Sequence, residues 1–154
     1  MTSTPGIQTG PLAGLRVLDF GTFVAGTYNA VLLGELGAKV IKVESLEGDS
    51  SRYLGPFMAG ESRAFVGWNR NKRGIALDLR NPAATEIIHK LVRNADIVTE
   101  NFRPGVTKRL KLDYDTFKAI NPRLIYCSST GFGTQGPLRD RPSYDAVLQT
   151  MGGV

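Results

Sequence analysis

The chain has 154 residues, 42% of them hydrophobic, which fits one domain with a substantial core. Charged residues make up 21%, which excludes a chain disordered by composition, and no apolar run approaches the roughly 20 residues that cross a bilayer. The net charge is +5, but the basic residues are scattered among acids and not interleaved with aromatics, so neither a nucleic acid nor a membrane is the expected partner.

The first residues of the chain indicate the cellular compartment of the protein. Residues 1–11 are rich in Ser, Thr and Gly and carry no charged side chain, whereas secretory signals and mitochondrial presequences carry basic residues. This segment is therefore predicted to be a flexible tail of a cytoplasmic protein. The single cysteine, Cys127, forms no internal disulfide, which agrees with a reducing compartment.

Strands and helices are predicted to alternate along the chain. The apolar run 15–20 (LRVLDF) is typical of a buried parallel strand. Residues 25–36 place apolar side chains at helical spacing until Gly37 ends the helix, and the β-branched segment 39–44 (KVIKVE) predicts a second strand. A strand, helix and strand in this order predict a right-handed crossover unit.

A second round of the same pattern follows. Asn81 before Pro82 is a strong helix start, and an apolar helix face continues from there. The later predicted elements are a strand at 96–100, short helices near 105–110 and 114–120, a fourth strand at 124–128, and a last helix from near Ser143. Residues 47–70 and 131–142 are predicted to be loops.

The alternation predicts a doubly wound α/β fold with a mainly parallel sheet and flanking helices, over residues 12–154. The last predicted helix reaches Gly152 with no closing element after it. We therefore expect the chain to be a truncated part of a larger protein or assembly.

Ligands of doubly wound sheets bind beyond the carboxyl ends of the strands. Four segments rich in glycine, hydroxyl or basic residues are expected there: 21–26, 44–52, 101–109 and 128–137. They are predicted to bring Arg52, Arg80 and Arg109 to one edge of the sheet, where arginines suit a phosphate-bearing anion. A nicotinamide dinucleotide is not predicted, because Phe23 stands where GxGxxG needs a glycine, although Glu44 is an acid in a suitable place.

Other catalytic patterns are weak. His89 is the only histidine and is expected to be exposed on a helix, and with no Cys pair a metal site is not expected. Cys127 lies in a strand predicted to be buried, where a thiol is inert. Ser128 and Ser129 lack the histidine of a hydrolase elbow. Asp145 is expected near a helix N-terminus, where a carboxylate is favourable.

A more specific signal comes from motifs that cover almost the whole chain in a fixed order. They are 11–20 (PLAGLRVLDF), 36–44 (LGAKVIKVE), Gly48-Asp49 with Arg52, 69–79 (NRNKRGIALDL), 95–106 (ADIVTENFRPGV), 121–126 (NPRLIY), 131–137 (GFGTQGP), and Tyr144-Asp145 with Gln149 and Gly152. With these motifs the chain resembles the family III CoA-transferases, the CaiB/BaiF group that includes formyl-CoA transferase, carnitine CoA-transferase and α-methylacyl-CoA racemase.

The resemblance implies a Rossmann-like large domain, a smaller second domain, and an interlocked homodimer that holds CoA at the domain junction. It implies an enzyme that moves CoA between an acyl-CoA and a carboxylic acid. The family's nucleophilic aspartate lies beyond the point that matches Val154. The chain is therefore expected to supply the CoA-binding part and to be inactive alone. The alternatives are an acyl-CoA racemase or isomerase and a non-catalytic CoA-binding subunit.

The resemblance also implies roles for individual residues. It places Thr22, Phe23, Val24 and Ala25 at the CoA thiol end, and Leu79 and Arg80 at the adenosine and phosphate part. It places Asn101, Phe102 and Arg109 at the pantetheine and phosphates. Tyr144 and Asp145 face the acyl group, with Asp145 in a supporting catalytic role.

Some positions depart from the family pattern. Thr22 and Val24 replace the polar His and Gln of formyl-CoA transferase, and Thr27 replaces a proline that is frequent in the family. The less polar loop implies a larger or more apolar acyl group than formate. Tyr144 stands where racemases of the family carry a His, and a tyrosine takes no proton near neutral pH. This favours a transferase over a racemase.

Overall fold

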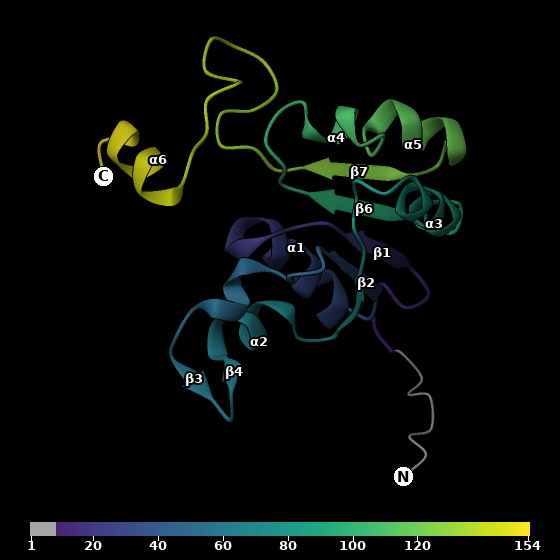
Figure 1. The fold of residues 1–154 in the computed structure, drawn as a ribbon, viewed down its shortest axis with the longest axis horizontal. Coiled ribbons are helices and arrows are strands. Elements are labelled where there is room, and N and C mark those ends of the chain that lie inside the picture. Colours follow the sequence, from purple (N-terminus) through teal and green to yellow (C-terminus); the bar gives the residue numbers. More distant parts are fainter. Residues whose placement is uncertain (1–8) are drawn as a thin grey trace.

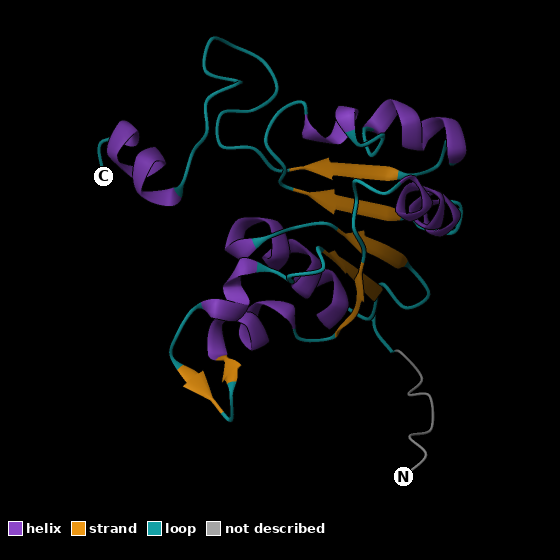
Figure 2. Cartoon of the chain, viewed as in Figure 1, coloured by secondary structure: helices purple, strands orange, loops and turns teal. Residues whose placement is uncertain are grey.

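The computed structural model describes residues 9–154, so most of the predicted tail lies outside the described residues. The main sheet has five parallel strands in the order β5-β2-β1-β6-β7 (Figures 1 and 2). These strands are β1 (Arg16–Asp19), β2 (Lys39–Glu44), β5 (Lys72–Ala76), β6 (Ile97–Glu100) and β7 (Ile125–Ser128). The predicted doubly wound α/β fold is confirmed.

Helices cover both faces of this sheet (Figure 2). The helices are α1 (Phe23–Glu35), α2 (Arg63–Asn69), α3 (Pro82–Val92), α4 (Val106–Arg109), α5 (Tyr114–Ile120) and α6 (Asp145–Gly152). Because successive strand residues point to opposite faces, Val17 packs with Ala30 of α1, whereas its neighbour Leu18 packs with Ile88 of α3 and Phe117 of α5.

Local sequence explains where the main helices begin and end. The Ala38 amide donates to the Leu33 carbonyl at 3.0 Å and the Gly37 amide to the Gly34 carbonyl at 3.1 Å, with Gly37 at a φ of +102°. These are the two bonds of a Schellman motif, which ends α1. The Asn81 side chain accepts from the Ala83 amide at 3.0 Å and caps α3. Both predicted helix boundaries are confirmed.

The structure corrects the prediction of a loop over residues 47–70. This stretch holds a 3-10 helix, η1 (Ser50–Tyr53), a short hairpin of β3 (Phe57–Met58) and β4 (Glu61–Ser62), and α2. The Ser62 hydroxyl accepts from the Phe65 amide and caps α2, which is only 7 residues long. Elements this short have no hydrophobic period that sequence analysis can detect.

The two edge strands of the sheet differ from what the sequence indicated. The edge strand β5 was not predicted, because its sequence (KRGIA) is basic and mostly exposed and it forms by pairing with β2. Cys127 was expected to be buried and is exposed. It lies on the edge strand β7, where Tyr126 packs into the core while Ile125, on the other face, is 62% exposed.

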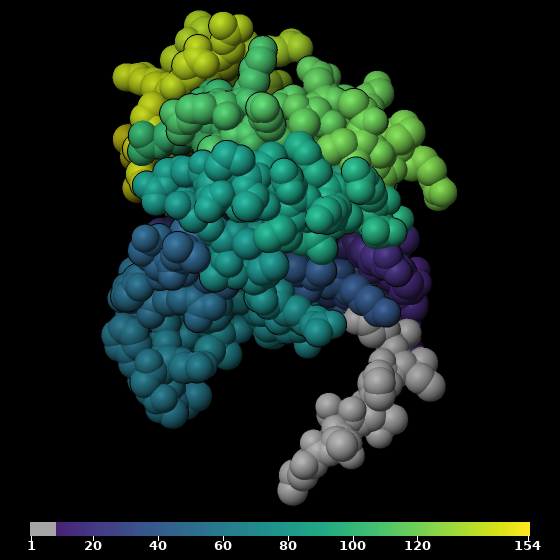
Figure 3. All heavy atoms as spheres, turned by 45° about the vertical axis from the view of Figure 1, so that its right-hand side comes forward, coloured from purple at the N-terminus to yellow at the C-terminus, as the bar shows by residue number. Residues whose placement is uncertain are grey.

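The direction of chain progression reverses between β1 and β6, which are neighbours in the sheet. A ligand-binding crevice is expected at the carboxyl ends of strands at such a switch point. In Figure 1 these ends face left, between α6 above and the β3–β4 hairpin below. Figure 3 shows residues of α6 (yellow) and of the hairpin (blue) at opposite ends of the molecule.

Candidate functional site

The loop between β1 and α1 lies at the switch point and is joined to the segment that follows β6. The Asn101 side chain accepts from the Thr22 amide at 2.8 Å and donates to the Thr22 carbonyl at 3.0 Å. Two residues that are 79 positions apart in sequence are thus held together at this edge. The structure therefore brings together Thr22 and Asn101, two of the predicted ligand contacts.

Close packing and an unusual backbone conformation shape this loop. A Cβ at Gly21 would clash with the Gly26 carbonyl group, so this position requires glycine, and a Cβ at Gly26 would displace the Asn101 side-chain amide. Phe23 has a φ of +56°, which is rare for a bulky residue. The Thr27 hydroxyl donates to the Phe23 carbonyl. Residues 22–25 are exposed, which leaves the predicted thiol-end contacts accessible.

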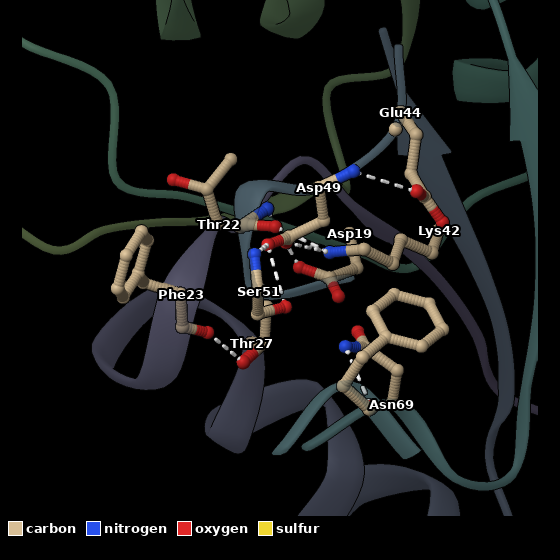
Figure 4. Close-up of polar contacts among 12 residues, drawn as sticks. Asp19, Thr22, Phe23, Thr27, Lys42, Glu44, Asp49, Ser51 and Asn69 are labelled. Carbon is tan, nitrogen blue, oxygen red and sulfur yellow. Dashed lines mark hydrogen bonds and ion pairs between the residues drawn. The ribbon is translucent and has the colours of Figure 1, made fainter. Parts of the chain in front are cut away.

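A buried polar cluster lies beside the loop (Figure 4). We use this name for Asp19, Lys42, Asp49, Ser51 and Lys72. The Lys72 ammonium lies 2.7 Å from the Asp19 carboxylate, and the Lys42 ammonium lies 2.9 Å from the Asp49 carboxylate. All four of these side chains are at most 2% exposed. Two buried cations and two buried anions neutralise each other within this cluster.

The cluster shifts the pKa values of Asp49 and Lys72. Burial alone would raise the pKa of Asp49, but hydrogen bonds from Ser51 and Lys42 outweigh burial and hold the pKa below the ordinary value of 3.8. Burial lowers the pKa of Lys72, and the nearby Asp19 carboxylate opposes this effect. The charged form of Asp49 is therefore favoured by the fold.

We expect Asp49 to make the protein less stable in acid. A carboxyl group whose folded-state pKa is depressed contributes stability above its unfolded pKa, and this contribution is lost as pH falls through the folded pKa. The urea midpoint should therefore drop as the pH falls below about 4. Asp49→Asn should be less stable at neutral pH and show a shallower drop in acid. Parallel pH curves for the two proteins would contradict this role.

Arg52, one of the predicted phosphate-binding arginines, is engaged by an acidic neighbour. Its guanidinium makes two 2.8 Å bonds to Glu44 and lies 3.6 Å from the centroid of the Phe65 ring. Glu44 also accepts from the Asp49 amide at 2.9 Å. Arg52 thus lies at the carboxyl end of β2, the edge of the sheet where it was expected, but Glu44 engages its guanidinium and Arg52 does not line the groove that holds Arg80 and Arg109.

A groove of about 390 Å³ gathers three of the predicted ligand contacts. Leu79, Arg80 and Arg109 line it together. Its other lining residues come from α3 and from the end of α4: Pro82, Thr85, Glu86, His89, Leu110 and Lys111. Its volume falls in the range of small-molecule sites.

The groove is predominantly basic. The Arg80 side chain is 84% exposed and lies 2.9 Å from Asp78, and its hydrogen bond lowers the pKa of that carboxyl. Within residues 9–154 no carboxylate forms an ion pair with Arg109. Lys111 adds a third cation, and Glu86 is the one acid among the lining residues. This arrangement suits a ligand with several negative charges.

His89 was expected to be exposed and is instead half-buried. Its Nε2 lies 3.1 Å from the Lys111 carbonyl, and its ring meets the Phe117 ring edge-on with centroids 6.1 Å apart. His89 is half-buried because α5 packs against α3. Lys111 has a φ of +56° and was missed by sequence analysis, since no motif marked it.

The remaining predicted contacts lie apart from the groove. The Phe102 ring packs against Phe20 with centroids 6.4 Å apart. Tyr144 is 70% exposed at the start of α6, and Asp145 accepts from the Gln149 side chain at 2.8 Å. Asp145 lies in the first helical turn as expected. In Figure 1, α6 stands clear of the sheet, so the structure does not bring Tyr144 and Asp145 to the other predicted residues.

Among residues 9–154 no helix combines the length and the apolar character of a membrane span. In the same residues, His, Cys, Asp and Glu side chains form no group of three that suits a metal ion.

Comparison with known proteins gives consistent matches. The chain is 42% identical to acetyl-CoA:oxalate CoA-transferase of Acetobacter aceti over 99% of its own length and 39% of the relative. It is 41% identical to the succinyl-CoA–L-malate CoA-transferase beta subunit of Chloroflexus aurantiacus, over 94% of this chain and 36% of the relative.

Solved structures agree with these matches. A CAIB/BAIF family protein from Brucella suis superposes with a TM-score of 0.91 at 45% identity, over 96% of this chain and 40% of that protein. Rv3272 from Mycobacterium tuberculosis superposes with a TM-score of 0.88 at 38% identity, over 95% of this chain and 41% of that protein. The chain thus spans about two fifths of the length of these relatives. Since the sequence profile of CoA-transferase family III also matches residues 12–154, the chain belongs to this family.

Proposed function

We propose that the chain supplies the CoA-binding part of a cytoplasmic CoA-transferase, which moves CoA between an acyl-CoA thioester and a free carboxylic acid. The observation that carries the proposal is the basic groove that gathers Leu79, Arg80 and Arg109. Family membership supports the same reaction, because several relatives are named CoA-transferases.

Each part of CoA has a matching part of the site in this proposal. The phosphates bind Arg80 and Arg109, whose planar guanidinium groups donate parallel hydrogen bonds to phosphate oxygens. Leu79 contacts the adenosine. The pantetheine arm passes Phe102 and Asn101 on its way to the β1–α1 loop. There Thr22, Phe23, Val24 and Ala25 surround the thiol end, with the Asn101–Thr22 hydrogen bonds joining the two regions.

The reaction also needs a carboxylate that first carries the acyl group and then CoA. Asp19, at the loop, is buried and paired with Lys72, and Asp145 stands apart on α6. We therefore propose that the nucleophilic aspartate comes from chain beyond Val154 and that Tyr144 and Asp145 support the acyl group in the complete protein. The proposed assembly is a homodimer.

A transfer assay on the full-length protein tests this function. Acetyl-CoA and succinyl-CoA serve as donors, and oxalate, malate and glutarate as acceptors, since relatives carry these names. We expect mass spectrometry to detect a new acyl-CoA with the full-length protein and none with residues 1–154 alone. Transfer by residues 1–154 at the full-length rate would contradict the division of roles.

Two other results would overturn the proposed reaction. Exchange of the α-proton of a 2-methylacyl-CoA in D2O, without transfer to any acid, would indicate a racemase or isomerase. CoA binding without either reaction would indicate a non-catalytic subunit.

A further inference from the structure

Both backbone polar groups of Gly21 are held by buried charged side chains. The Gly21 amide donates to the Asp19 carboxylate at 2.8 Å, and the Gly21 carbonyl accepts from the Lys42 ammonium at 2.6 Å. Lys42 extends from β2, and a dashed line in Figure 4 joins its ammonium to the Asp49 carboxylate. The residue at the very start of the β1–α1 loop is thus held from both sides.

Packing alone does not account for a lysine at position 42. Its side chain is 2% exposed, and burying an ammonium costs several kcal/mol unless partners compensate it. An apolar side chain of similar length would fill the same space without this cost. Lys42 instead links the Gly21 carbonyl to Asp49, whose carboxylate is itself held by the Ser51 amide at 2.8 Å and the Ser51 hydroxyl at 2.7 Å.

The β1–α1 loop contains a backbone conformation that its surroundings must impose. Phe23 has the left-handed φ of +56°, and such a conformation in a bulky residue persists only where its surroundings impose it. The Phe23 ring points away from the polar cluster and is partly exposed (Figure 4). Gly21 lies two residues before Phe23, so the orientation of its peptide directs the path of the chain into α1.

We propose that Lys42 is a positioning residue: with Asp49 as its partner, it orients the Gly21 peptide and so sets the β1–α1 loop in the conformation that receives the reacting end of the thioester. This inference rests on the proposed function of the loop. Lys42 acts on the α1 face of the sheet, whereas Arg80 and Arg109 line a groove beside α3 and α4. The loss of Lys42 should therefore impair turnover and spare binding of the nucleotide end.

The test compares full-length Lys42→Met with the unaltered protein. Misplacement of a reacting group by about 1 Å can cost 100-fold in rate, so we expect kcat for CoA transfer to fall by about 10- to 100-fold. The affinity for adenosine 3′,5′-bisphosphate, measured by calorimetry, should stay unchanged. Hydrogen exchange of amides 21–26 should accelerate. Lys42→Arg should restore part of kcat, and Asp49→Asn should reproduce part of the loss.

A destabilised control separates positioning from general loss of stability. Val92 is 0% exposed on α3, away from the loop, and Val92→Ala leaves a small cavity. Its kcat and its exchange at residues 21–26 should match the unaltered protein. Equal loss of kcat in Val92→Ala, or unchanged kcat and exchange in Lys42→Met, would overturn the proposal. If the unaltered protein transfers no CoA, the proposed function fails, and the exchange data still decide whether Lys42 holds the loop.

Discussion

Replacing Asp19 by alanine should lower the free energy of unfolding by about 3–5 kcal/mol, the usual cost of removing one partner of a buried ion pair. The Lys72 ammonium, with a side chain 2% exposed, would lose its carboxylate at 2.7 Å. It would keep only the Thr27 carbonyl at 2.8 Å and the Asn69 amide oxygen at 3.2 Å. Urea denaturation followed by circular dichroism measures the change.

Companion variants test whether loss of the buried ion pair causes this drop in stability. Asp19→Asn keeps an oxygen that can accept from Gly21 and Thr99, so it should cost less than Asp19→Ala. Adding Lys72→Met to Asp19→Ala should cost less than the sum of the two single changes, because no unpaired charge remains. The control is Glu35→Gln, which removes a half-exposed pair with Arg70 and should cost at most about 1 kcal/mol. An equal cost for Asp19→Ala and Glu35→Gln would contradict the prediction.

Replacing Arg109 by alanine should weaken CoA binding about 10- to 150-fold in the full-length protein. This corresponds to the roughly 1.5–3 kcal/mol of a charge-assisted hydrogen bond. The physical reason is that Arg109 lines the basic groove beside Arg80, where we propose that the phosphates lie. Titration calorimetry with CoA measures the affinity.

The matched control is Arg123→Ala, which removes an equal charge from an exposed position outside the groove. We expect it to leave CoA affinity almost unchanged. Affinity for the unaltered protein should also fall with added salt, because salt screens the attraction between arginines and phosphates. Equal losses in the two variants would show that net charge, and not a contact in the groove, governs binding.

Much of the fold was predictable because its signals are local. The β-branched segment of β2 and the proline at the start of α3 depend only on neighbouring residues, and the structure confirms both elements. The glycine that ends α1 also acts locally, because a left-handed residue suits glycine. The order of these elements was sufficient to indicate a doubly wound α/β sheet.

Which polar groups meet depends on the tertiary packing. Sequence analysis placed Arg52 with Arg80 and Arg109, but Arg52 pairs with Glu44, and this contact depends on how the η1 segment folds back on β2. The hydrogen bond from the buried Lys42 ammonium to the Gly21 carbonyl also joins residues from β2 and the β1–α1 loop. No local pattern encodes such contacts, since distance in space and exclusion of water arise only when strands and helices pack. Local sequence was sufficient to indicate β1, β2, β6, β7, most of the helices and the family resemblance, whereas packing determined β5, the elements within residues 47–70 and which charges are free to bind a ligand.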